Sequence, residues 1–428
     1  MEILLFFLLF LSFFIAIIAF VKTKDHLHPS VLSAIFISLP LIIAMQRLSG
    51  LQAKEWNFLT YTLFCYALIA FNYLPFFISI YCNNKYKSGE QVKKSKIFIT
   101  NISNKLIYFF SILTLVLYLF ENKVLVGHFV PVLSTSNLTS IHLISLPIIS
   151  MITKGFIPIL ALLNFTKYKF NANKYNLIMC LFLIAIPMTR LSRFDIILAV
   201  LAIIFLLSDI VKNKKRFFNL TAILLIVMSL IAAYLGEFRL THGYQYQLSY
   251  AEGIDYNYYA GPFNIFAVLY GYFPLSFENV NSFINRNPDF DDLQWGKVML
   301  RPLLAGLLKF DNIFGEAYPL TDFLYKYSNY VSPYATVHTA TIEFALDFGY
   351  VFSIIPMLFV SLILTFVYIN SLRYSSYRLA YYIIAQGLVF YSFFNMFFEP
   401  KMIYQICLLL FIIIVSGLLN QRKIKNYI

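Results

Sequence analysis

Charged residues are scarce in this chain of 428 residues: Asp, Glu, Lys and Arg make up 12% of it, against about 25% in soluble domains. Hydrophobic residues make up 60%, which excludes an ordinary soluble globular protein. Cysteines are few, and all lie in or beside apolar segments: Cys65, Cys82, Cys180 and Cys407. That pattern argues against a disulfide scaffold, and no Cys-x-x-Cys pair offers a zinc or redox site.

Common nucleotide-binding and catalytic motifs are absent as well. The chain has no phosphate-binding P-loop, no G-x-G-x-x-G, no H-E-x-x-H and no G-x-S-x-G. These absences argue against an ATPase or a zinc protease, and we expect no cofactor and no bound metal. The formal charge of +13 does not indicate a nucleic-acid partner, because the lysines are spread over short loops between apolar segments. A basic protein embedded in a lipid bilayer accounts for the charge better.

Apolar segments of membrane-spanning length fill most of the chain. The first, Ile3 to Val21, has no basic region before it and is about twenty residues long, which indicates a membrane helix rather than a cleaved signal peptide. Further spans are predicted at approximately 31–46, 58–82, 106–121, 140–164, 175–190, 194–211, 217–236, 348–370, 379–398 and 403–419. The predicted fold is therefore an all-α polytopic membrane protein of about 11 transmembrane helices.

The distribution of Lys and Arg predicts the orientation of these spans. Most of the 33 basic residues fall in the loops after the first, third, fifth, seventh and ninth spans and in the C-terminal tail. Because loops on the cytoplasmic side carry the excess of Lys and Arg, we expect a cytoplasmic C-terminus and an external N-terminus. In a bacterium, this is a multi-pass protein of the inner (cytoplasmic) membrane.

The longest polar segment lies on the external side in this topology. The chain divides into spans one to eight (1–236), one large external loop between spans eight and nine (237–336), and spans nine to eleven with the tail (337–428). The loop is rich in Tyr, Phe and Leu, so disorder is not expected. Loops of this length are usually functional, and two apolar stretches in it, 258–277 and 298–310, suit amphipathic or re-entrant helices.

Several cations at predicted membrane depth or at the outer surface are candidate anion-binding groups. Arg190 and Arg193 end and begin neighbouring spans, and would share one helical face if the turn between them is itself helical. Two guanidinium groups there would suit phosphate oxygens. Snorkelling to lipid headgroups, or pairing of Arg193 with Asp195, is the structural alternative. Lys154 lies midway along the predicted fifth span, where it should face a cavity or a carboxylate.

The external loop adds further candidates for substrate binding. Arg239 and His242 directly follow span eight, near the bilayer surface, where they would attract lipid headgroups or a diphosphate. Arg301 stands in an apolar setting in which a charge needs an anionic partner. Surface solvation is the simpler account of Arg286, Lys297 and Lys326.

The segment before span nine carries the candidate catalytic residues. Thr339, Glu343 and Asp347 recur every four residues, so a helix would place them on one face. His338 would lie about 140° around that helix from Glu343, so the two side chains need not touch. A His and a carboxylate at the mouth of a membrane cavity would serve as general base and positioning group. Alternatively, the two acids simply stabilise the positive end of a helix dipole.

The order and spacing of three loose motifs resemble the bacterial oligosaccharide repeat-unit polymerases, the O-antigen polymerase-like family. Ser192-Arg193 opens a long apolar span, Tyr258-Tyr259 begins the aromatic run YYAGP of the external loop, and Thr339 precedes Asp347-Phe348-Gly349 at the next span. The resemblance covers roughly residues 185 to 420. His338 stands where the family commonly has Tyr, so its catalytic role is an inference from this sequence alone.

The resemblance implies a glycosyltransferase of lipopolysaccharide (O-antigen) biosynthesis. Such an enzyme transfers a growing glycan en bloc from undecaprenyl diphosphate to a lipid-linked repeat unit at the outer face of the membrane. It implies a flippase and a chain-length regulator as partners. We assign the diphosphate to Arg190, Arg193, Arg239 and Arg301, with Lys154, His242, Tyr258 and Tyr259 as further substrate contacts. Glu343 and His338 are candidate bases, and Asp347 supports them.

Two other functions fit the same topology. The O-antigen ligase that joins finished glycan to the lipid A core resembles the polymerases in its spans, its large external loop and its late external His. A secondary transporter or flippase is the alternative from another class. Transporters tend to show internal repeats with broken helices in both halves, and no such symmetry is visible in this sequence.

Overall fold

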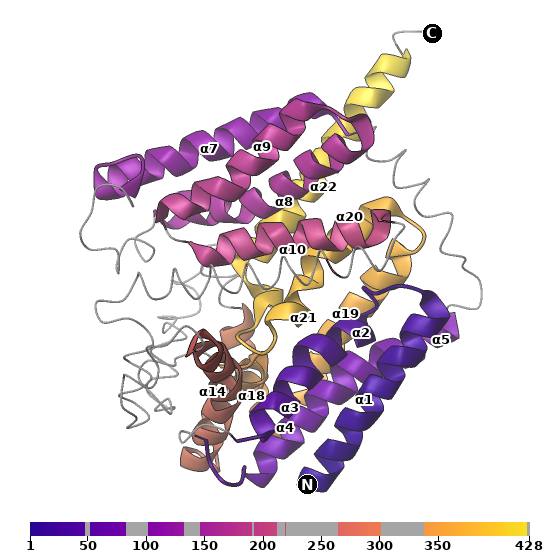
Figure 1. Cartoon of the computed structure of the whole chain (residues 1–428), viewed down its shortest axis with the longest axis vertical. Coiled ribbons are helices and arrows are strands. Elements are labelled where there is room, and N and C mark those ends of the chain that lie inside the picture. The colour runs from indigo at the N-terminus through magenta and orange to yellow at the C-terminus, as the bar shows by residue number, and fades with distance from the viewer. Residues whose placement is uncertain are drawn as a thin grey trace. The chain divides into compact units, whose positions relative to one another are not determined.

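The computed structural model describes residues 1–47, 52–82, 102–131, 146–190, 192–211, 219, 264–300 and 338–425. In this part of the chain every regular element is a helix and no strand occurs, as the sequence predicts (Figure 1). Five helical segments are long and apolar enough to cross a membrane: Glu2–Thr23, Phe58–Cys82, Asn104–Val126, Ile354–Ser371 and Lys401–Leu418. An all-helical membrane protein is therefore supported, whereas the full number of spans stays a prediction.

Most predicted spans coincide with described helices. The predicted span 217–236 lies outside the described residues apart from residue 219, and the predicted span 379–398 is not one helix but α20 (Ser375–Ile384), α21 (Gln386–Phe390) and a 3₁₀ turn, η6 (Met396–Phe398). Some segments are shorter or more broken than a single span. The predicted span 175–190 is an α-helix, α9 (Lys174–Ala185), that tightens into a 3₁₀ turn, η5 (Ile186–Arg190). The span predicted to begin at residue 140 begins as a helix only at Pro147.

The chain forms two compact units that interleave in sequence. The first unit comprises 1–86, 242–369 and 387–399, and the second comprises 87–241, 370–386 and 400–428. These units differ from the predicted division at residues 236 and 336, which follows membrane topology rather than compactness.

Helices of the first unit pack around two broken spans. Its elements are α1 (Glu2–Thr23), α2 (Pro29–Ser33), η1 (Ala34–Ser38), α3 (Leu39–Met45), α4 (Phe58–Leu68), η2 (Ile69–Tyr73), α5 (Leu74–Cys82), α14 (Asn264–Arg286), α18 (Ala340–Phe352) and α19 (Ile354–Ser371). The segment 387–399 adds most of α21 (Gln386–Phe390) and a 3₁₀ turn, η6 (Met396–Phe398). Helix α1 packs on α2 and α4, and α14 packs on α3 and α4 (Figure 1).

Prolines explain why two of these spans are interrupted. The π-helical segments η1 and η2 directly precede Leu-Pro steps that contain Pro40 and Pro75. Proline lacks an N–H and its ring crowds the carbonyl four residues earlier, so the helix widens there. The carbonyl of Phe36, which Pro40 leaves without its usual donor, accepts a hydrogen bond of 2.8 Å from the Ser392 hydroxyl. A side chain thus satisfies a backbone group that lipid could not.

The second unit contains α7 (Asn104–Val126), α8 (Pro147–Asn171), α9, η5, α10 (Arg193–Ile210), α20 (Ser375–Ile384) and α22 (Pro400–Lys425). Helix α8 is its centre and packs against α7, α9, α10 and α22 (Figure 1). A close approach between α8 and α22 is possible because Gly155 has no side chain: a Cβ there would lie 2.7 Å from the Cβ of Tyr404. Small residues serve this purpose in membrane helices.

Candidate functional site

Helix α18 brings His338 and Glu343 into contact. Its first helical residue is Ala340, with Thr339 in the N-cap position and an extended backbone there. The amide of Ala340, one of the free N–H groups of a helix start, donates to the carbonyl of Tyr391 at 2.8 Å. The hydroxyls of Thr341 and Tyr391 lie 2.9 Å apart. The start of α18 is therefore fixed to the segment 387–399.

The imidazole Nε2 of His338 lies 3.3 Å from Oε1 of Glu343, and both side chains are almost fully buried. An angle of about 140° on a helical wheel suggested that the two need not meet, but His338 precedes the helix, so the wheel does not apply to it. The same carboxylate oxygen accepts the backbone N–H of Asn395 at 3.1 Å. Glu343 is thereby held in place by two donors.

The second ring nitrogen of His338 is free among the described residues. Its Nδ1 atom is buried and has no hydrogen-bond partner there. An ionised carboxylate can only accept hydrogen bonds, so a neutral His338 bound to an ionised Glu343 carries its hydrogen on Nε2. That tautomer leaves a lone pair on Nδ1, which is what a general base requires.

Asp347 accepts hydrogen bonds from the backbone of a neighbouring segment. It lies one turn after Glu343 in α18 and is completely buried. Its two carboxylate oxygens accept the N–H groups of Val298 and Met299 at 2.9 and 2.8 Å, at the start of a helix that begins at residue 297. Burial raises the pKa of Asp347 to about 6, against the opposing effect of these hydrogen bonds. Asp347 thus connects α18 to the segment 294–300.

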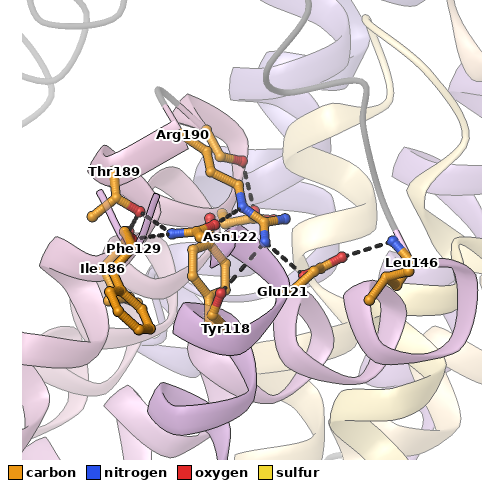
Figure 2. A network of polar contacts seen from close by, with 10 residues as sticks. Tyr118, Glu121, Asn122, Phe129, Leu146, Ile186, Thr189 and Arg190 are labelled. Atoms are coloured by element: carbon orange, nitrogen blue, oxygen red, sulfur yellow. Dashed lines mark hydrogen bonds and ion pairs between the residues drawn. The ribbon is translucent and has the colours of Figure 1, made fainter. Parts of the chain in front are cut away.

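In the second unit, Arg190 lies in a buried cluster with Glu121, Asn122 and Tyr118, which we call the arginine cluster (Figure 2). Its Nη2 is 2.9 Å from Oε2 of Glu121, its Nε donates to Asn122, and its guanidinium lies over the Tyr118 ring at 4.4 Å. The other oxygen of Glu121 accepts the N–H of Leu146 at 2.9 Å, where α8 begins. Only Nη1 of Arg190 has no hydrogen-bond partner among the described residues.

The predicted pairing of Arg190 and Arg193 on one helical face required a helical turn between them. Ser192, directly before α10, has a non-helical backbone, so that condition is not met. The side chain of Arg193 lies outside the described part of the structure. Asp195, the alternative partner of Arg193, accepts from the Ser192 hydroxyl at 2.6 Å and from Lys401 at 2.8 Å.

Lys154 lies about two turns into its helix, and its depth in a membrane stays a prediction. Helix α8 begins at Pro147, so Lys154 is about 10 Å from that end. Its ammonium is within electrostatic reach of Asp195, Lys401 and Arg190. Among the described residues it makes no hydrogen bond or ion pair of its own. No described carboxylate forms an ion pair with it.

The other predicted substrate contacts lie outside the described residues: Arg239, His242, Tyr258, Tyr259 and Arg301. In the part that is described, no group of three His, Cys, Asp or Glu side chains could hold a metal ion. Sequence reasoning missed Glu121 and Lys401, although a carboxylate at the end of an apolar span opposite a buried arginine is a usable signal.

Comparisons of the chain with protein-family models, with curated proteins and with solved structures give no match.

Proposed function

We propose that this protein is a membrane glycosyltransferase that polymerises lipid-linked oligosaccharide repeat units, with undecaprenyl diphosphate as the leaving group. The observation that carries the proposal is the buried His338–Glu343 pair, in which Nδ1 of His338 has no hydrogen-bond partner among the described residues. The resemblance of the sequence to repeat-unit polymerases names the substrate class.

In the proposed step, Nδ1 of His338 accepts the proton of a sugar hydroxyl on the acceptor repeat unit. The hydroxyl oxygen forms a bond to the anomeric carbon of the donor glycan. The bond from that carbon to the diphosphate oxygen breaks, and undecaprenyl diphosphate leaves with the electron pair. Glu343 stabilises the imidazolium that forms, because its carboxylate already accepts from Nε2. The proton then passes to solvent or to the departing diphosphate.

A diphosphate leaving group requires cations, and the proposal keeps the predicted ones. Arg193, Arg239, His242 and Arg301 remain candidates from sequence. Lys154 is the strongest of the described candidates, because no described carboxylate forms an ion pair with its ammonium group. Arg190 is the weakest, since Glu121 and Asn122 take up most of its donors. The donor glycan is already activated, so the reaction needs no nucleotide site, in agreement with the missing phosphate-binding motifs.

Contacts between helix ends that are distant in the sequence support the side of the membrane to which the predicted topology assigns each end. In the second unit, Glu121 and Arg190 end the predicted fourth and sixth spans on the external side, and they form an ion pair. Asp209 and Arg378 stand at predicted cytoplasmic ends, and they form another at 2.7 Å. Each pair joins two ends that the topology assigns to one side. The orientation of the whole bundle in the membrane stays part of the proposal.

Surface glycan from a strain that lacks the gene tests the proposal, with the complemented strain beside it on a gel. If the protein is a polymerase, the strain that lacks it carries a single repeat unit on the lipid A core and shows no ladder. If the protein is a ligase, that strain has no glycan attached to the core, and long chains accumulate on the carrier lipid. An unchanged ladder overturns both and favours a transporter.

The catalytic assignment has its own variant and control. His338→Asn should abolish the ladder at normal protein level, because Asn cannot accept the proton. His128, an exposed His that the topology also assigns to the external side, provides the matched control His128→Asn, which should keep the ladder. A normal ladder from the His338 variant would remove it from the mechanism.

A further inference from the structure

A strained turn in the first unit presents a tryptophan to solvent. Trp295 and Gly296 have positive φ angles of 51° and 86° in succession. Glycine adopts such angles freely, but a bulky residue at positive φ is an outlier. The Trp295 side chain is 73% exposed, so burial of the indole does not compensate for the backbone conformation.

Four hydrogen bonds donated by backbone amides hold this turn on α18. The amides of Gln294 and Trp295 donate to the carbonyls of Leu346 and Asp347 at 3.1 and 2.9 Å. The two amides that follow the turn, at residues 298 and 299, donate to the Asp347 carboxylate. Leu346 therefore fixes the backbone before Trp295, and Asp347 fixes the amide of Trp295 and the backbone after the turn. Strain that the surroundings enforce in this way is typical of functional sites.

The turn lies near the proposed catalytic pair in the same unit. Asp347, which binds the amide of Trp295, follows Glu343 by four residues in α18, or about 6 Å along the helix axis. The backbone of Trp295 is thus held roughly one helical turn from the carboxylate that binds His338. A ring so placed can contact a neighbouring part of the substrate that reacts at His338.

The residues before Trp295 distinguish a sugar ligand from a lipid surface. Segment 287–296 contains three exposed aspartates, Asp289, Asp291 and Asp292, and no Lys or Arg, although Arg286 and Lys297 flank it. Carboxylates repel the anionic headgroups of a bacterial membrane. They accept hydrogen bonds from hydroxyl groups, and the negative face of an indole attracts the polarised C–H groups of a sugar ring.

We propose that Trp295 is an aromatic platform for the acceptor glycan, with the neighbouring aspartates as hydrogen-bond acceptors for its hydroxyls. That this glycan is the acceptor of the reaction rests on the proposed function. The fixed backbone limits the positions that the ring can reach before substrate arrives, which reduces the entropy lost on binding.

Intrinsic fluorescence tests this directly, because the chain has only two tryptophans. Trp56 is buried, 5% exposed, and donates from Nε1 to Glu278 at 2.8 Å, whereas Trp295 is exposed. In the purified Trp56→Phe protein in detergent, all tryptophan emission comes from Trp295. The probe is the soluble repeat-unit oligosaccharide, released by mild acid from the lipid-linked pool of the producing strain.

We expect a saturable blue shift or quench of Trp295 emission as oligosaccharide is added. Trp295→Phe, which retains Trp56, is the matched control and should not respond. If Trp56→Phe does not fold, the difference between wild type and Trp295→Phe isolates the same signal. No change up to millimolar oligosaccharide overturns the proposal. So does strong quenching by brominated phospholipids in vesicles without a response to oligosaccharide, which identifies a membrane anchor.

The binding assay is independent of turnover, so its outcome is separable from that of the proposed function. His338→Asn protein should still bind the oligosaccharide. A normal ladder in the gene deletion would refute the polymerase while the fluorescence assay still reports whether the turn binds sugar. In the active enzyme, Trp295→Ala should raise the KM for acceptor by about tenfold or more with a smaller effect on kcat, and Trp295→Phe should largely restore it.

Discussion

The guanidinium of Arg190 and the carboxylate of Glu121 lie 2.9 Å apart and are both almost completely buried. Removing one member of such a pair leaves a buried charge without compensation, at a cost of about 3–5 kcal/mol. We therefore predict that Arg190→Ala lowers the thermal stability and the cellular level of the protein. Thermal unfolding in detergent and quantitative immunoblotting measure both effects.

A double variant separates a structural role of Arg190 from diphosphate binding. Arg190→Gln with Glu121→Gln removes both charges and should recover part of the stability lost in Arg190→Ala. If it then supports a normal glycan ladder, Arg190 does not bind diphosphate. Lys154→Gln provides the comparison, because Lys154 forms no ion pair with any described residue. It should cost little stability, and its effect on the ladder reports substrate binding.

His338 and Glu343 should behave as a single catalytic unit. His338→Asn removes the proposed base and should lower the polymerisation rate by about 10²–10⁴-fold. Glu343→Gln keeps the shape but gives an amide that cannot stabilise the imidazolium, so it should also slow the reaction. Residues that act as a unit give strongly non-additive losses, and the double variant should be scarcely worse than His338→Asn.

The measurement is transfer of radiolabelled repeat units in membranes that contain equal amounts of each variant. Additive losses in this double-mutant cycle would show that the two residues act independently. If Glu343→Gln polymerises at the wild-type rate, the role of Glu343 is structural: it holds α18 against the backbone of Asn395.

The sequence predicted the helical membrane character well, because hydropathy and segment length depend only on local composition. The position of Glu121 at the end of an apolar span makes it a candidate partner of Arg190, but the choice among such carboxylates depends on how the helices pack. The same holds for Lys401 and Asp195, which are distant in the chain and meet only through the packing of their helices.

One contact and one helix start differ from what the sequence predicts, each for a local reason. Helical-wheel angles were applied to His338, which lies before the first residue of α18, so its actual contact with Glu343 was not foreseen. The apolar segment that contains Lys154 begins at residue 140, yet its helix begins at Pro147. Where helices begin depends on capping and tertiary contacts, which hydropathy does not report.

Asp347 should make the protein less stable as the pH rises through about 6. Burial raises the pKa of its carboxyl to about 6 in the folded protein, whereas in an unfolded chain the pKa is about 3.9. Between these values the folded state binds more protons, so stability falls with increasing pH. The contribution of Asp347 is complete below about pH 4 and is lost as the pH passes through about 6.

Thermal unfolding of wild type and Asp347→Asn between pH 4 and 7 measures this contribution. The variant lacks the titrating group, so wild type should lose on the order of 3 kcal/mol relative to it across that range. Asp289→Asn, at an exposed aspartate of the same unit, is the control and should follow wild type. Parallel curves for wild type and Asp347→Asn would contradict the prediction.

Gly155 should be essential for the packing of α8 on α22. A Cβ at this position would lie 2.7 Å from the Cβ of Tyr404 and 3.3 Å from the carbonyl oxygen of Lys401, so the two helices would have to separate. Overpacking of this kind costs about 1–3 kcal/mol. Gly155→Ala should therefore lower the unfolding temperature and weaken the ion pair between Lys401 and Asp195. In α22 itself, Gly417→Ala is the matched control, because no described atom outside the adjacent backbone lies within 4 Å of the added Cβ. The control should be neutral or slightly stabilising, since Ala favours a helix by up to about 1 kcal/mol over Gly. Equal unfolding temperatures for the two variants, measured in the same detergent, would show that α8 and α22 do not need this close approach.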